Sequence, residues 1–240
     1  MKIELNTIYN MDCLEGMKAI PDGSVDCVLT DPPYLFVKGG MKNPKWNTGK
    51  MAAESYMNKE MADFDGSRIS EMLDAIAPKF KHGWNAYFYC SEMQIVYYMQ
   101  YAIEHKLRYN LLIWDREVRK MISKKFYRSN IDYIVRIYGK GNSLNNVEGN
   151  TMDLYSKIRI AKQPNETGHE TEKPISHFCD FIKLSSNEGD VILDPFMGSG
   201  TTAIACIKEK RNYIGFELNE EYYRKSLDRI QRELSQPSLF

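Results

Sequence analysis

The sequence lacks the features that would place the protein in a membrane, in a disulfide framework or at a zinc site. No apolar run is long enough to span a bilayer, and residues 1–6 contain no signal-peptide core. The five cysteines occur singly, and no two of them form a CxxC pair. We therefore expect a cytoplasmic protein from a reducing compartment, without a bound metal.

An excess of charge of either sign is also missing. Lysine and arginine together number 32, as do aspartate and glutamate, so the net charge gives no indication of a nucleic-acid partner. Any such surface must come from local clustering of basic residues. At 240 residues the chain is long enough for one large α/β domain and short for two.

Apolar runs typical of buried strands alternate with segments of helical periodicity. The strand-like runs are 3–9, 25–29, 86–90, 109–114, 131–138, 191–193 and 213–216, and the helical segments are 69–77, 93–105, 175–182, 202–209 and 219–234. This alternation predicts an α/β fold with a doubly wound parallel sheet. We expect a single domain over 1–240, with a mobile loop at about 35–67, an insertion at about 115–168 and a free tail at 235–240.

The segment Asp31-Pro32-Pro33-Tyr34 directly follows the predicted strand 25–29. Two successive prolines cannot continue a sheet ladder, but they fix the backbone and leave their carbonyls free. At the carboxyl edge of the sheet, Asp31 and the Pro32 carbonyl can accept both N–H bonds of a planar amine while Tyr34 stacks on its ring. The exocyclic amine of a nucleobase fits this set. An ordinary Pro-Pro turn with a surface tyrosine explains the four residues equally well.

A second loop, residues 194–202, joins the strand 191–193 to a helix. It lacks the P-loop lysine, because Thr201 follows Gly200, and it lacks the third glycine of GxGxxG. The Asp194 carboxylate at its mouth would repel a pyrophosphate and accept a cation, and Glu217 after the next strand is placed for ribose hydroxyls. A ligand with cationic groups and a ribose but no phosphate points to S-adenosylmethionine.

The DPPY segment, the DPFMGSGTT loop and the HETEKP box at 169–174 resemble the bacterial DNA amino-methyltransferases of the permuted, beta arrangement, in which the catalytic motif precedes the cofactor loop. The resemblance covers nearly the whole chain outside 35–67 and 139–168. It implies a Rossmann-like, S-adenosylmethionine-dependent methyltransferase sheet of seven strands, one of them reversed. The implied catalytic residues are Asp31, Pro32, Pro33 and Tyr34, and the implied cofactor-binding residues are Asp12, Cys13, Lys173, Pro174, Asp194, Phe196, Gly198, Gly200, Thr201 and Glu217.

The reaction implied is transfer of the sulfonium methyl group to the N6 amine of adenine in DNA after base flipping. Accepting both N–H bonds favours a pyramidal nitrogen as positive charge develops, and stacking on Tyr34 offsets part of the cost of flipping. The same site could serve the N4 amine of cytosine, although cytosine members of the family more often carry serine in place of Asp31. A catalytically silent DNA-binding regulator on the same fold is the alternative from another class; the intact motifs count against it.

One part of the chain, 116–140, is rich in basic residues interleaved with aromatic ones. We expect phosphate contacts with double-stranded DNA here and in the loop 35–67, and target recognition in the insertion 115–168; a solvated surface is the alternative. The expected DNA-binding residues are Lys38, Lys42, Arg119, Lys120, Lys124, Lys125 and Arg128.

The C-terminal tail contains two large apolar residues that the predicted fold does not need. The segment 236–240 resembles the pentapeptide by which bacterial polymerases and repair proteins bind the sliding DNA clamp. The residues expected to bind are Gln236, Leu239 and Phe240. A frayed terminus, or a tail folded back on the body, is the alternative. Sequence alone leaves open whether the chain forms a homodimer.

Overall fold

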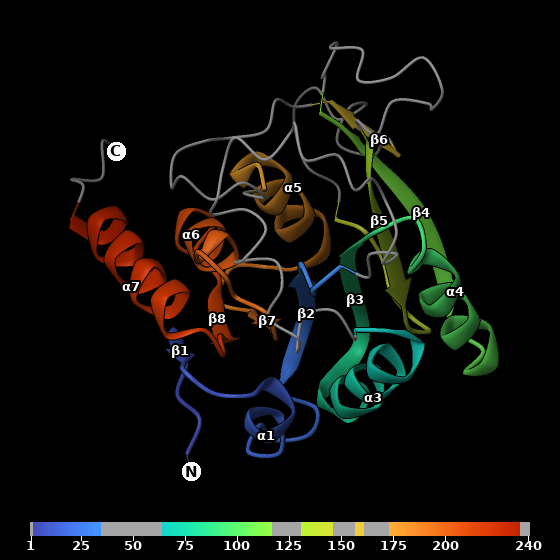
Figure 1. Cartoon of the computed structure of the whole chain (residues 1–240), viewed down its shortest axis with the longest axis horizontal. Helices are drawn as coiled ribbons and strands as arrows, with labels where there is room; N and C mark the ends of the chain where they lie inside the picture. Colours follow the sequence, from blue (N-terminus) through green and yellow to red (C-terminus); the bar gives the residue numbers. More distant parts are fainter. Residues whose placement is uncertain (1, 35–63, 117–130, 146–156, 161–172, 236–240) are drawn as a thin grey trace, which may run out of the picture.

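The computed structural model describes residues 2–34, 64–116, 131–145, 157–160 and 173–235. Within these residues the strands form one eight-stranded sheet in the order β1-β8-β7-β2-β3-β5-β4-β6 (Figure 1). The strands are β1 (Thr7–Tyr9), β2 (Val25–Thr30), β3 (Phe80–Cys90), β4 (Arg108–Asp115), β5 (Ile131–Tyr138), β6 (Ile158–Ile160), β7 (Val191–Asp194) and β8 (Asn212–Phe216).

One strand runs against all the others. β5 pairs antiparallel with both β3 and β4, whereas every other pairing in the described sheet is parallel. The predicted sheet of seven strands with one reversed is therefore confirmed for β1 to β5, β7 and β8. The short strand β6 adds an eighth, beside β4 at the edge of the sheet.

The structure refines the bounds of the predicted loop at about 35–67 and of the predicted insertion at about 115–168. The helix α3 (Gly66–Ile76) begins inside the end of the loop predicted at about 35–67, because the Asp65 side chain caps it by accepting hydrogen bonds from the backbone of Ser67 and Arg68. The range 115–168 contains β5, which is paired on both sides within the sheet. An insertion can therefore occupy only parts of that range.

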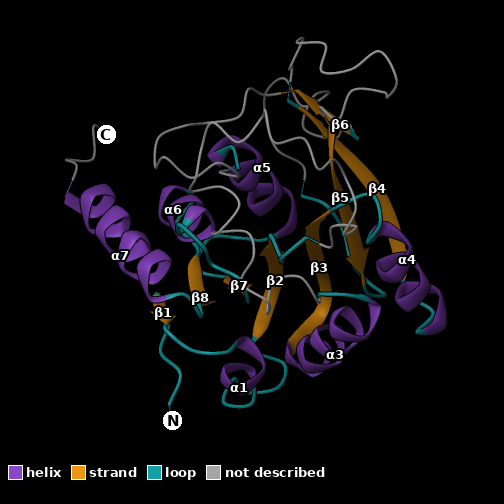
Figure 2. Ribbon diagram, in the orientation of Figure 1, coloured by secondary structure: helices purple, strands orange, loops and turns teal. Residues whose placement is uncertain are grey.

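Helices cover both faces of the sheet (Figures 1 and 2). One apolar core lies between the sheet and α1 (Cys13–Met17), α3 and α4 (Ile95–Glu104), and a short 3₁₀ turn (Ala77–Lys79) follows α3. The other core lies between the sheet and α5 (Ile175–Ser185), α6 (Thr201–Lys208) and α7 (Glu220–Ser235). Successive strand residues supply opposite cores: Phe88 packs in the first, Tyr87 and Tyr89 in the second. None of the helices in the described residues is long and apolar enough to cross a membrane.

Four neighbouring parallel strands end at the same edge of the sheet. β2 lies beside β7, β7 beside β8, and β8 beside β1. The residues that follow these strand ends are Asp31, the loop that starts at Pro195, Glu217 and Asn10, two residues before Asp12. The fold therefore brings the DPPY segment next to the glycine loop, although more than 150 residues separate them in the sequence.

A substitution of Phe181 measures how much the packing of α5 on the sheet contributes to stability. Its buried ring stacks on Tyr87 of β3 at a centroid distance of 4.4 Å. We expect Phe181→Ala to lower the free energy of unfolding by about 3–5 kcal/mol, because the surroundings cannot collapse into the space of a stacked ring. Leu234→Ala, at a position 65% exposed on α7, is the control and should change stability by no more than about 0.5 kcal/mol. Urea denaturation measures both; equal effects would contradict the packing described.

Candidate active site

The turn formed by residues 31–34 leaves two acceptors open at the carboxyl edge of the sheet. Asp31 Oδ2 accepts a hydrogen bond from Lys173 Nζ at 2.6 Å. The other carboxylate oxygen, Oδ1, is buried and accepts no hydrogen bond from the part of the chain that the structure describes. The Pro32 carbonyl likewise receives no hydrogen bond from the described residues. A buried acceptor without a donor is costly, so this arrangement fits a ligand that brings N–H groups.

Lys173 lies two residues before the start of α5, and its side chain reaches the catalytic turn. Its side chain is 5% exposed, and Nζ lies 5.1 Å from the centroid of the Tyr34 ring and 5.4 Å from that of Tyr89. Pro174 takes the N-cap position of α5 and fixes the backbone directly after the lysine. Sequence reasoning assigned Lys173 to the cofactor, whereas in the structure its ammonium group binds the DPPY carboxylate.

The Tyr34 phenol is neutral in this setting. Burial, and after it the negative charge of Asp31, raises its pKa well above the ordinary value. A neutral ring at a strand end can stack on a planar ligand without adding charge to the site. This is the environment that the predicted stacking role requires.

A second carboxylate lies close to the ion pair and was not singled out from the sequence. Burial raises the pKa of Asp132 on β5, while the charges of Lys173 and then Arg116 oppose that rise. Arg116 Nη2 lies 4.0 Å from Asp132 Oδ1. The available signal was an acidic residue near the start of a strand whose one other charged residue is Arg136.

The buried side chain of Gln94 holds the DPPY turn in place, and the sequence did not predict this role. It is 1% exposed, and its Nε2 donates to the Pro33 carbonyl at 2.9 Å and to the Phe64 carbonyl at 3.0 Å. Its Oε1 accepts hydrogen bonds from the backbone N–H and the hydroxyl of Ser91. The ring of Phe64 in turn packs edge-on against Phe196 of the glycine loop at 5.3 Å. One buried amide thus connects the DPPY turn to the loop after β7.

Two glycines of the loop have a backbone conformation that other residues disfavour. Gly198 and Gly200 have φ angles of 54° and 85°, a region that side chains rarely adopt. A Cβ atom on Gly200 would lie 3.1 Å from Ser226 Cβ, so this glycine permits close packing of α7. A Cβ on Gly198 would meet only the Phe196 carbonyl, at 3.9 Å, among the described residues. The space in front of Gly198 is therefore open to a ligand.

Glu217 closes this space from the end of β8. Its Oε2 accepts a hydrogen bond from Gly198 N and its Oε1 one from Asn219 N, both at 2.8 Å. Burial raises the pKa of the carboxyl, and the backbone hydrogen bonds oppose the rise. Each oxygen retains a lone pair, which fits the predicted contact with ribose hydroxyls.

Asp194 does not point to the loop's mouth, where sequence reasoning expected it to meet a cation. The carboxylate is 2% exposed and accepts hydrogen bonds from Thr30 Oγ1 at 2.6 Å, from Phe196 N at 3.0 Å, and from Thr202 Oγ1. Burial raises its pKa to about 7, opposed chiefly by the Thr202 and Thr30 hydrogen bonds. This geometry assigns Asp194 to holding β2, the loop and α6 together. Thr201, the first residue of α6, is also buried, with its hydroxyl 3.2 Å from Arg229 Nη1.

Asp12 and Cys13 lie at the start of α1. Asp12 caps this helix by accepting hydrogen bonds from Leu14 N and Glu15 N, and the side chain is otherwise exposed at the sheet edge. The Cys13 side chain packs in the apolar core, and burial raises the pKa of its thiol to about 12. Its side chain is therefore not presented to a ligand, and the assignment of Cys13 to the cofactor stays a prediction.

All predicted DNA contacts and the predicted clamp-binding tail lie outside the described residues. This applies to Lys38, Lys42, Arg119, Lys120, Lys124, Lys125 and Arg128, and to Gln236, Leu239 and Phe240. These assignments stay predictions. Among the residues that are described, no group of His, Cys, Asp or Glu could hold a metal ion.

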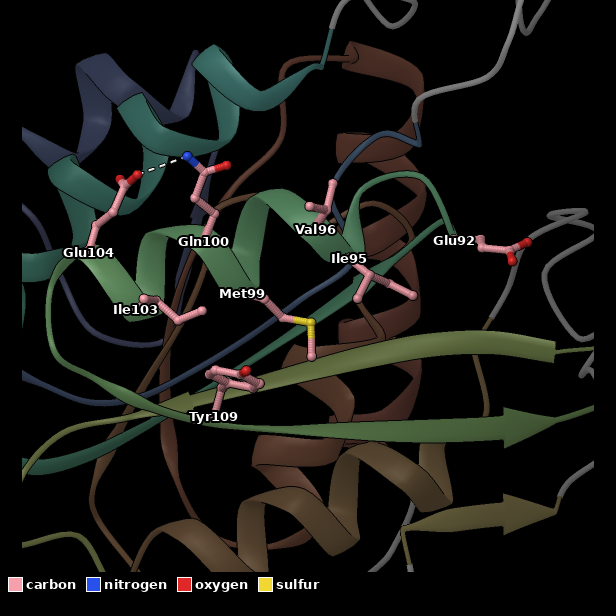
Figure 3. Close-up of a pocket in the computed structure, with 8 residues that line it drawn as sticks. All are labelled: Glu92, Ile95, Val96, Met99, Gln100, Ile103, Glu104 and Tyr109. Carbon is pink, nitrogen blue, oxygen red and sulfur yellow. Dashed lines mark hydrogen bonds between the residues drawn. The ribbon is translucent and has the colours of Figure 1, made fainter.

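A separate hollow of about 540 Å³ lies on the outer side of α4 (Figure 3). Ile95, Val96, Met99 and Ile103 of the helix line it together with Tyr109 of β4. None of the predicted catalytic or cofactor-binding residues lies in it, so it is distinct from the site at the strand ends.

The sheet order, the glycine loop and Glu217 define a methyltransferase of the S-adenosylmethionine-dependent class. Residues 25–228 match the family described as DNA methylase, which comprises the N6 and N4 amino-methyltransferases. The chain belongs to this family, and the predicted resemblance is confirmed.

Two curated relatives and two solved structures illustrate the likeness. The chain is 25% identical over 243 residues to the type II methyltransferase M.HpaI of Haemophilus parainfluenzae, covering 93% of this chain and 74% of that protein. It is 25% identical over 260 residues to the DNA adenine methyltransferase YhdJ of Escherichia coli (strain K12), with 95% and 83% covered. The M1.HpyAVI–SAM complex has a TM-score of 0.68 at 24% identity, covering 93% and 98% of the two chains. The cytosine-N4-specific PvuII DNA methyltransferase has a TM-score of 0.69 at 15% identity, covering 97% and 92%.

The Gln94 amide is expected to control both stability and turnover. Gln94→Leu leaves the Pro33 and Phe64 carbonyls without their donor, so we expect a loss of about 1–3 kcal/mol in the free energy of unfolding. A displaced DPPY turn should also lower kcat by about 10- to 100-fold. Gln100→Leu on the exposed face of the same helix, where the amide bonds Glu104, is the matched control. Equal behaviour of the two variants would show that Gln94 does not hold the turn.

The raised pKa of Asp194 predicts how stability depends on pH. The folded protein keeps a proton on this carboxyl up to about pH 7, whereas the unfolded chain releases it near its ordinary value of 3.8. This group therefore favours folding most below pH 4, and that contribution falls, by on the order of 4 kcal/mol, as the pH rises to 7. Asp194→Asn removes the titration and keeps the shape. Urea denaturation at pH 4.5 and 7.5 should show a smaller decline in the variant; identical declines would contradict the assignment.

Proposed function

We propose that the protein transfers a methyl group from S-adenosylmethionine to the N6 amine of adenine in DNA, with the base flipped out of the duplex. The observation that carries this proposal is the pair of open acceptors on one turn, the buried Asp31 Oδ1 and the Pro32 carbonyl, next to the neutral ring of Tyr34. An aromatic amine with two N–H groups satisfies both acceptors at once.

The residues act by binding and orientation. The amine of adenine is a poor nucleophile, because its lone pair is delocalised into the ring. When Asp31 and Pro32 accept both N–H bonds, they favour a pyramidal nitrogen and stabilise the positive charge that develops on it. The product nitrogen is a strong acid, so it passes one proton to Asp31 Oδ1, which returns it to water. A stacked base on Tyr34 offsets about 1–3 kcal/mol of the cost of flipping.

S-Adenosylmethionine supplies an electrophilic sulfonium methyl group. The residues that would hold it fit its chemistry: Gly198 leaves open space in front of the loop, and Glu217 presents acceptors for ribose hydroxyls. Phe196 adds a half-buried aromatic face, fixed by the backbone hydrogen bond to Asp194. The loop 194–202 itself contains no lysine or arginine for a phosphate, which fits a cofactor that has none.

We favour adenine over cytosine because cytosine members of the family more often carry serine at the position of Asp31. The family contains enzymes named for either base: YhdJ is called a DNA adenine methyltransferase, and the PvuII enzyme is called cytosine-N4-specific. The two amines present the same pair of N–H groups, so the turn alone accepts both. The identity of the base is therefore the first quantity to measure.

Methyl transfer from labelled S-adenosylmethionine to DNA of a methylation-free host tests the proposal. Digestion to nucleosides and mass spectrometry should yield N6-methyladenine. N4-methylcytosine would replace the proposed base by its alternative, and binding without any transfer would favour the silent regulator. Native long-read sequencing of the same DNA identifies the methylated sequence.

Two substitutions should separate the catalytic turn from the cofactor loop. Asp31→Ala should lower methyl transfer at least about 100-fold and leave cofactor affinity nearly unchanged, because Asp31 faces the target amine. Gly198→Val should abolish cofactor binding, because a branched side chain fills the open space at a positive φ of 54°.

Gly23→Val is the control for Gly198→Val. It introduces the same residue at a φ of 66° in a turn with no neighbour within 4 Å, away from the site. Calorimetric titration with the cofactor and a transfer assay measure all three variants. A collapse of cofactor affinity in Asp31→Ala would overturn the role given to the turn.

A further inference from the structure

The carboxylate of Asp31 in the DPPY turn binds Lys173, which lies 142 positions further along the sequence. The distance of 2.6 Å between Lys173 Nζ and Asp31 Oδ2 is that of a charge-assisted hydrogen bond. The exposed fractions of the two side chains are 5% and 25%. An ion pair this sheltered is screened little by solvent, so it has a defined geometry rather than a fluctuating one.

We propose that Lys173 is a positioning residue for methyl transfer: it holds Asp31 by Oδ2 and so directs Oδ1 toward the target amine. This inference rests on the function proposed above and gives the HETEKP box a role toward the target base. The aromatic rings of Tyr34 and Tyr89 on either side confine the ammonium group to this position.

The need for a cation follows from the surroundings of Asp31. A carboxylate at a buried strand end loses solvation, and protonation would turn one of its acceptors into a donor. The other titratable groups near it are the carboxyls of Asp132 and Asp194, the phenols of Tyr34 and Tyr98, and the thiol of Cys90. All of these are neutral or negative, whereas the cation Arg116 lies against Asp132. Lys173 is thus the cation in direct contact with Asp31 among the described residues.

The expected effect on the kinetic constants follows from this arrangement. Lys173 binds the carboxylate that faces the target amine, so its loss should lower kcat far more than it changes KM for DNA or the affinity for the cofactor. A substituted cation should restore kcat in part.

The test compares Lys173→Met and Lys173→Arg with the wild-type protein by kcat and KM, using DNA of a methylation-free host. Lys173→Met should lower kcat about 100-fold and leave KM for DNA nearly unchanged. Lys173→Arg should regain part of the lost kcat, because it keeps the charge but changes the geometry. Lys183→Met on α5, where the lysine pairs with Glu209, is the matched control and should keep the wild-type kcat.

Calorimetry of the same variants measures their affinity for the cofactor and shows whether Lys173 binds the cofactor instead. A Lys173→Met protein that loses cofactor affinity and keeps the wild-type kcat at saturating cofactor would make Lys173 a cofactor-binding residue and overturn the proposal. An unchanged kcat with unchanged affinity would overturn it too.

A stability cycle tests the ion pair without any enzymatic activity. Asp31→Asn and Lys173→Met each leave one charge sheltered and unpaired, so each should lower Tm by about 5 °C or more. The double variant has neither charge and should recover most of that loss. Strictly additive losses would overturn the proposal. Wild-type protein that fails to methylate DNA but shows this coupling would instead refute the proposed function and leave the ion pair established.

Discussion

The carboxylate of Asp194 is the interaction on which the site depends. It joins Thr30, the last residue of β2, to Thr202 in α6 and to the backbone of the glycine loop. Thr30 is followed directly by Asp31, so one buried group fixes where the catalytic turn begins and how the cofactor loop leaves β7. A hydrogen bond in this dry interior is strong, and breaking it is costly. The position of the catalytic turn relative to the cofactor loop is therefore rigid.

Most of the fold could be predicted because the signals were local. The predicted strand 131–138 coincides with β5, and the side-chain oxygen of the predicted cap Asn219 accepts a hydrogen bond from Tyr222 N at the start of α7. The family resemblance implied that one strand is reversed but did not say which; the structure identifies it as β5, because direction leaves no trace in a strand's own residues. The strand β6 was missed because three residues give too short a period to recognise.

The site was predictable where one segment carries the chemistry, and not where distant segments meet. Positive φ at Gly198 and the acceptors of the DPPY turn follow from residues adjacent in sequence. Lys173 and Gln94 contact the turn across 142 and 61 positions, respectively, and these contacts depend on the order of strands in the sheet. Asp194 shows the same limit: its position at a strand end was predicted, but the direction of its side chain is set by two threonines on other elements.

The double hydrogen bond of Gln94 also has a consequence for how related proteins can diverge. Its Nε2 binds the carbonyls of Pro33 and Phe64, which flank the segment 35–63, so the two ends of that segment are anchored to one atom. Closing a longer chain between fixed ends costs only about 0.6 kcal/mol for each doubling of its length. The segment can therefore be shortened, lengthened or replaced by a different one during evolution without moving Asp31. The catalytic framework around Asp31 can stay the same while this segment varies.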